Sequence, residues 1–134
     1  MKQNLLLLIL AICALGSVTA SQQKGDSPCA SVSGTQAEAN ACARSRFNQA
    51  DEQMKQVYEQ LLSELSGYGS DGKAQQKLRQ AQSVWLQYRD SNCDSEASIY
   101  DGGSIRPAVY YSCLASITLE RTARMKEFLD VTRQ

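Results

Sequence analysis

The sequence predicts an all-α fold, an antiparallel three-helix bundle stapled by two disulfides. Three long segments carry apolar residues at steps of three and four, which is the period of one helix face. Two glycine-rich turns separate the segments, and no segment alternates apolar and polar residues as a half-buried strand does. Because short connections make neighbouring helices run antiparallel, the three segments are expected to fold back on one another.

The first 20 residues have the pattern of a secretory signal peptide. Lys2 gives a charged start, residues 5–15 form an apolar run, and Val18-Thr19-Ala20 places small residues before a cleavage site. The mature chain is therefore expected to begin at Ser21.

No membrane anchor is expected from this leader. Its apolar run is shorter than the roughly 20 residues that a spanning helix needs. Cys13 follows Ile12, a bulky residue where a lipoprotein signal carries a small one. We therefore expect a periplasmic or secreted protein with no membrane span.

Cleavage after residue 20 leaves four cysteines: Cys29, Cys42, Cys93 and Cys113. An even number of cysteines in an exported chain predicts two disulfides, with three possible pairings. No two of them are spaced as C-x-x-C, so neither a metal knuckle nor a redox centre is expected, and no cofactor is implied.

Residues 21–34 are rich in Ser, Gly and Gln and are expected to form a loose lead-in to a helical domain over residues 35–134. The first helix is predicted to run from Thr35 to Ser66. Thr35-x-x-Glu38 is a capping box, in which both side chains pair amides that a helix start leaves free. Its apolar stripe consists of Phe47, Ala50, Met54, Val57, Tyr58, Leu61 and Leu65.

Residues 67–72 (GYGSDG) are expected to break this helix, with Ser or Asp capping the next one. The second helix is predicted to end near Tyr100, before the turn at residues 101–104. Pro107 suits the first turn of a third helix, because its missing N–H has no partner there. Later stripe residues are Leu78, Ala81, Trp85, Tyr88 and Asn92, then Tyr110, Cys113, Leu114, Ile117, Arg121, Met125 and Phe128.

The two turns also predict which residues lie at the same level of the bundle. If the chain folds back at the first turn, Asp51 lies at the same height along the bundle as Tyr88 or Arg89, and Met54 lies at the same height as Trp85. If it folds back again at Gly103, Cys93 lies at the height of Cys113, and Trp85 at the height of Arg121. This match favours the pairs Cys93–Cys113 and Cys29–Cys42. The alternative, Cys42–Cys93 with Cys29–Cys113, stays open because Cys42 lies near the level of Cys93.

A polar group is expected inside the bundle. Trp85 and Arg89 share one helix face, so the guanidinium can stack on the indole and also fork onto a carboxylate such as Asp51. We interpret the group as a structural network that fixes helix register, with a ligand site as the alternative. Its members are Asp51, Trp85, Arg89, Asp90, Thr118 and Arg121.

The tip of the second hairpin is predicted to be acidic. Between Asp90 and Gly102 the chain carries only negative charges, including Asp94, Glu96 and Asp101. We expect these three and the turn Gly102-Gly103-Ser104 to bind a partner, although a solvated helix end is the simpler interpretation. Tyr100, Tyr110 and Tyr111 are candidates for an aromatic rim.

Composition excludes several functions. The chain of 134 residues has no histidine, so Ser-His-Asp and Cys-His catalysis and histidine-ligated zinc are impossible. Its 14 basic and 14 acidic side chains give zero net charge, which disfavours nucleic acid as a partner. No carboxylate pair or buried Ser–Lys pair is evident, so an enzyme is not expected.

The order of these motifs resembles the LprI N-terminal domain family over about residues 29–129. The specific element is Ala81-Gln82-x-x-Trp85-x-x-Tyr88-Arg89-Asp90-x-x-Cys93, flanked by Thr35-x-x-Glu38, Asp51-x-x-Met54, Cys113 and Thr118-x-x-Arg121. The family comprises small exported bacterial helical proteins, named after a mycobacterial lipoprotein described as a lysozyme inhibitor. The leader lacks that protein's lipid attachment signal.

The resemblance implies a bacterial envelope or extracellular protein that inhibits lysozyme. We therefore expect a non-enzymatic binder whose partner is a lysozyme or another envelope protein, gripped by the acidic tip. Two alternatives remain open: an envelope scaffold without lysozyme activity, and a small-molecule binder with a cavity near Trp85.

Overall fold

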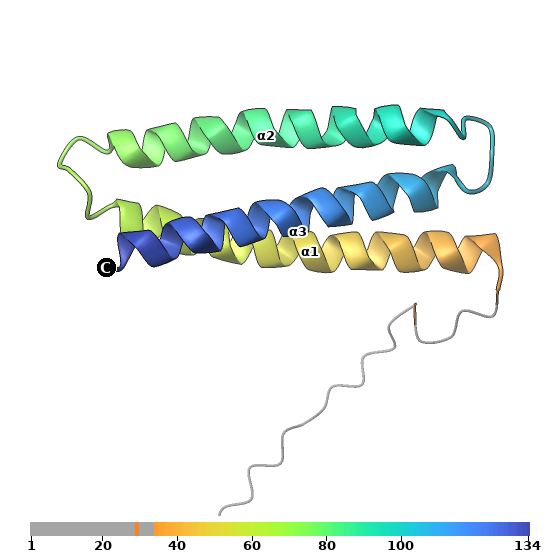
Figure 1. Cartoon of the computed structure of the whole chain (residues 1–134), viewed down its shortest axis with the longest axis horizontal. Coiled ribbons are helices and arrows are strands. Elements are labelled where there is room, and N and C mark those ends of the chain that lie inside the picture. Colours follow the sequence, from red (N-terminus) through yellow and green to blue (C-terminus); the bar gives the residue numbers. More distant parts are fainter. Residues whose placement is uncertain (1–28, 30–33) are drawn as a thin grey trace, which may run out of the picture.

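The computed structural model describes Cys29 and residues 34–134, and these form three long helices. The helices are α1 (Gln36–Leu65), α2 (Lys73–Ser98) and α3 (Arg106–Thr132). They run antiparallel in sequence order, with α3 packed along α1 and α2 packed mainly against α3 (Figure 1). The predicted all-α bundle is confirmed. The expected signal peptide (1–20) and, apart from Cys29 and Gly34, the lead-in (21–34) lie outside the described residues.

The first helix begins as the capping box predicts. The Thr35 hydroxyl accepts a hydrogen bond from the Glu38 amide at 3.3 Å, and the Thr35 amide donates to the Glu38 carboxylate at 3.3 Å. The helix ends at Leu65 with Ser66 as its cap residue, in agreement with the predicted end.

The two turns differ in detail from the sequence prediction. Gly72 occupies the cap position of α2 with a φ of 64°, and Asp71 accepts the Lys73 amide at 3.1 Å from one residue earlier. At the other turn α2 ends at Ser98, because the amides of Tyr100 and Asp101 bond to carbonyls three residues back. Pro107 lies in the first turn of α3, as expected.

Both predicted disulfides are present. Cys93 and Cys113 join α2 to α3 with their Cα atoms 5.5 Å apart, and Cys29 and Cys42 join the lead-in to α1 at 4.8 Å. The alternative pairing is therefore wrong. Since each bond closes a short loop, each is expected to stabilise the fold by about 3 kcal/mol.

The core consists of two apolar clusters with a polar layer between them. One cluster, near the first turn, is built on Met54, Leu61 and Met125; the other surrounds the Cys93–Cys113 disulfide. The buried polar residues on α2 and α3 fall between the two clusters in sequence, and hence in height: they are Gln82, Arg89, Thr118 and Thr122. Two of the six expected members, Arg89 and Thr118, belong to this layer, whereas Asp51, Trp85 and Arg121 are half-buried and Asp90 is exposed.

Candidate functional site

Arg89 is the centre of the polar layer. Its side chain is 9% exposed; Nη1 lies 3.2 Å from an Asp51 carboxylate oxygen and 3.5 Å from the Thr118 hydroxyl, and Nε donates to Asp90 at 2.9 Å. The guanidinium carbon lies 5.4 Å from the centre of the Trp85 ring, so the cation stacks on the indole. The expected contacts of Arg89 with Asp51 and Trp85 are thus present.

Two residues outside the expected group complete the surroundings of Arg89. Phe47 of α1 also contacts the guanidinium, with the ring centre 5.2 Å from the guanidinium carbon. Lys55 pairs with the second oxygen of Asp51 at 2.8 Å, and this carboxylate raises the pKa of Lys55. Lys55 follows Asp51 by one helical turn, so the spacing alone could have indicated this pair.

Arg121 forms a separate part of the polar layer. Its Nε donates to the Gln82 side chain at 3.1 Å, and its guanidinium carbon lies 5.7 Å from the Trp85 ring centre. The Gln82 amide in turn points at the sulfur of Met54, 3.4 Å away. Burial lowers the pKa of Arg121, and no carboxylate in the described part of the chain forms an ion pair with it. Both arginines therefore contact Trp85, but only Arg89 is neutralised.

The tip of the α2–α3 hairpin contains a cation that the sequence prediction did not count. Arg106, at the start of α3, donates to Asp94 and to Asp101, each at 2.6 Å, and both carboxylates raise its pKa. Glu96 instead accepts a hydrogen bond from Asn92 at 2.9 Å. The Ser104 carbonyl accepts one from Asn40 of α1, also at 2.9 Å. Ion pairs within the tip and a hydrogen bond to α1 thus hold the tip in place.

Exposed apolar side chains surround the same turn. Ile99 is 81% exposed, and Tyr100 and Ile105 are each 42% exposed. Gly102, with a φ of 80°, makes the turn between them. Neither isoleucine was among the predicted binding residues, although both lie outside the apolar stripes and flank the Gly102-Gly103 turn, which was a usable signal.

The expected aromatic rim is only partly exposed. Tyr110 and Tyr111 are half-buried against the Cys93–Cys113 disulfide, where their rings meet edge to face with centres 5.5 Å apart. Burial and the nearby acidic residues raise the pKa of Tyr110. Tyr100 is therefore the tyrosine that the tip presents to solvent.

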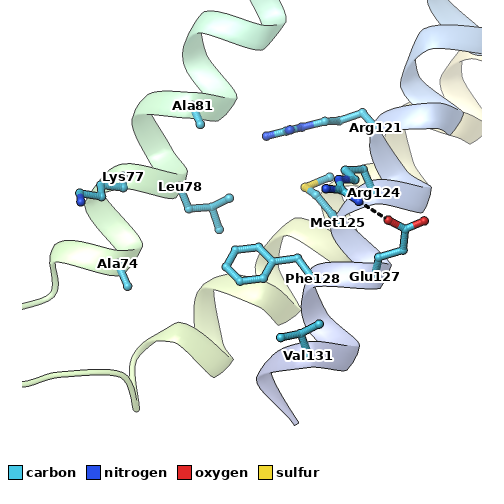
Figure 2. A pocket seen from close by; sticks show the side chains of 10 residues that line it. All are labelled: Ala74, Lys77, Leu78, Ala81, Arg121, Arg124, Met125, Glu127, Phe128 and Val131. Carbon is cyan, nitrogen blue, oxygen red and sulfur yellow. Dashed lines mark hydrogen bonds and ion pairs between the residues drawn. The ribbon is translucent and has the colours of Figure 1, made fainter. Parts of the chain in front are cut away.

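A groove lies at the opposite end of the bundle, between the start of α2 and the end of α3. Its volume is about 650 Å³ and its lining is mostly apolar (Figure 2). Arg121 extends from α3 across one end of it. A shallower hollow on α2 adjoins it through Lys77 and Ala81 and includes Trp85.

Neither a metal-binding cluster nor a membrane-spanning helix is present in residues 34–134 and Cys29. No set of three or more His, Cys, Asp or Glu side chains there is placed to hold a metal ion. None of the three helices has the length and apolar character needed to cross a bilayer.

The model of the family described as lysozyme inhibitor LprI matches residues 29–125. The chain belongs to this family. An uncharacterized protein of Rhizobium meliloti is 28% identical to this LprI-family chain, with 92% of each chain covered. No solved structure matches it. The matched span includes both disulfides, the polar layer and the hairpin tip.

Proposed function

We propose that this LprI-family protein is an exported, non-enzymatic inhibitor that inserts the tip of its α2–α3 hairpin into the cleft of a lysozyme. The observation that carries the proposal is the tip itself, where Ile99, Tyr100 and Ile105 expose apolar surface around a glycine turn. Exposed apolar groups that cluster on a small protein commonly mark an interaction surface. The family description supplies the class of partner.

The tip is held firmly enough to be inserted without a large loss of entropy. The Cys93–Cys113 disulfide joins the two helices below it, and Arg106 links Asp94 to Asp101 across it. The bond from Asn40 to the Ser104 carbonyl fixes the turn to α1. A rigid surface loses little conformational freedom on binding, which favours affinity.

The charge of the tip suits a cationic partner. Asp94, Glu96 and Asp101 outnumber Arg106, so a negative surplus remains after the ion pairs form. Opposite charges across an interface accelerate association, and salt weakens this effect. Inhibition of a basic lysozyme should therefore develop more slowly as ionic strength rises.

The test is a lysis assay with tip variants. Ile99→Ser and Ile105→Ser remove exposed apolar surface from the tip without touching the core, and each is expected to weaken inhibition about tenfold. Val131→Ser is the matched control, because Val131 is 65% exposed at the other end of the bundle. If Val131→Ser weakens inhibition as much as the tip variants do, insertion of the tip is wrong.

A further inference from the structure

The groove between α2 and α3 exists because small side chains face a helix that offers large ones. On α2, Ala74 and Ala81 lie about one turn on either side of Leu78 and leave space beside it. On α3, Phe128 points toward Leu78 and Val131 closes the lower end (Figure 2). These two side chains are 44% and 65% exposed, so the groove presents apolar surface to solvent.

The size and depth of this groove suit a small molecule. Its volume of about 650 Å³ falls within the range of roughly 300–1,000 Å³ that is usual for ligand pockets. Its floor includes Met125, which is 2% exposed and belongs to the core. An apolar chain lying on this floor would cover Phe128 and Val131.

Arg121 gives one end of the groove a charge that no carboxylate within residues 34–134 neutralises. The other arginines that are buried or half-buried, Arg89 and Arg106, each pair with two carboxylates. Arg121 has only the neutral Gln82 and the Trp85 ring in the described part of the chain, and its side chain reaches from α3 toward α2. A partly desolvated guanidinium without an anion favours binding one, and its planar N–H groups match a carboxylate.

We propose that the groove binds a single-chain amphiphilic carboxylate, with its apolar chain between α2 and α3 and its carboxylate on Arg121. The apolar lining and the Arg121 guanidinium at one end match the two parts of such a ligand. Lys77 adds a second positive charge to the lining, whereas Arg124 is already paired with Glu127 at 2.6 Å. This site is independent of the hairpin tip, which lies at the far end of the bundle (Figure 1).

The sole tryptophan makes binding directly observable. Trp85 contacts Arg121 and lines the adjoining hollow, so a carboxylate on Arg121 should change its fluorescence. Dodecanoate, titrated below its micelle concentration, is expected to give a saturable change. Dodecyltrimethylammonium, which has the same chain and the opposite charge, is expected to give none. Equal responses to both amphiphiles, or no response to either, would overturn the proposal.

Variants then locate the site, with affinity measured by calorimetry because substitution of Arg121 also alters the surroundings of Trp85. Arg121→Gln should weaken dodecanoate binding about tenfold or more, and Arg121→Lys should restore part of it. Ala81→Leu should block the groove without disturbing the core. Arg79→Gln is the control, since Arg79 is an exposed cation on α2 outside the lining. Unchanged affinity in Arg121→Gln and Ala81→Leu would contradict the assignment.

A second copy of the chain is the other possible occupant of this groove. Sedimentation velocity distinguishes the two, because the proposal expects no association that depends on the groove. A dimer that Ala81→Leu dissociates would overturn the proposal. Arg121→Gln and Ala81→Leu should inhibit lysozyme as well as the parent does. The groove proposal is therefore tested by dodecanoate binding alone, and the tip proposal by lysozyme inhibition alone.

Discussion

Replacing Arg89 by alanine tests the polar layer most sharply. The substitution removes a nearly buried guanidinium that bonds to Asp51 and Thr118 and contacts the rings of Phe47 and Trp85. A hydrogen bond to a charged group contributes about 1.5–3 kcal/mol, and the empty space adds to the loss.

The surroundings of Asp51 limit that cost. Breaking a buried ion pair usually costs about 3–5 kcal/mol, because the remaining charge has no partner. Here Asp51 keeps Lys55 at 2.8 Å, and its side chain is 20% exposed. Arg89→Ala is therefore expected to lower the free energy of unfolding by about 2–3 kcal/mol.

The assay is urea unfolding followed by far-ultraviolet circular dichroism, with Arg106→Ala as the control. Arg106 also bonds to two aspartates, but these are 66% and 67% exposed, and ion pairs in such positions contribute little. Arg89→Ala should therefore destabilise the protein far more than Arg106→Ala. Equal midpoints for the two variants, or an Arg89→Ala midpoint equal to that of the parent, would refute the reasoning.

Three further predictions concern the bundle. Replacing both Cys93 and Cys113 by alanine should lower stability by about 3 kcal/mol in urea unfolding, and an unchanged midpoint would contradict this. Thr35→Ala removes the acceptor for the Glu38 amide and should cost about 1 kcal/mol, whereas loss of several kcal/mol would mean that Thr35 has another role. Because folding raises the pKa of Tyr110, its contribution to stability is present below pH 10 and is lost as pH rises further; Tyr110→Phe should reduce this alkaline loss, measured as stability against pH.

Much of the fold follows from local patterns in the sequence. The three apolar stripes set the helices, and the capping box at Thr35 sets the start of the first one. The position of the turn at Gly103 placed Cys93 level with Cys113, and the observed disulfide joins these two. The same kind of argument placed Arg89 beside Asp51. The helical period and the short turns are sufficient to predict these contacts, because together they determine which residues of neighbouring helices lie at the same height.

The charges and exposed side chains of the hairpin tip depend on features that helical period and turn length do not determine. Arg106 returns to Asp94 and Asp101 only through the path of the turn, so counting charges between Asp90 and Gly102 omitted it. Ile99 belongs to neither stripe, and its exposure follows from the end of α2 at Ser98.

A small-molecule cavity near Trp85 was one of the open alternatives, but the lining of the groove itself was not predicted, for a related reason. Ala81 was assigned to the apolar stripe of the second helix, which says that it faces the bundle but not that its small side chain leaves a space. That space also depends on how far α2 lies from α3, and helix separation varies with the side chains at the contact.

Hydrogen exchange on the protein mixed with a lysozyme tests the central claim most directly. If the hairpin tip enters the cleft, backbone amides of residues 99–105 should gain protection, while those lining the α2–α3 groove should not change. The account would be contradicted if only other parts of the chain gained protection, or if no amide gained protection in the presence of saturating lysozyme.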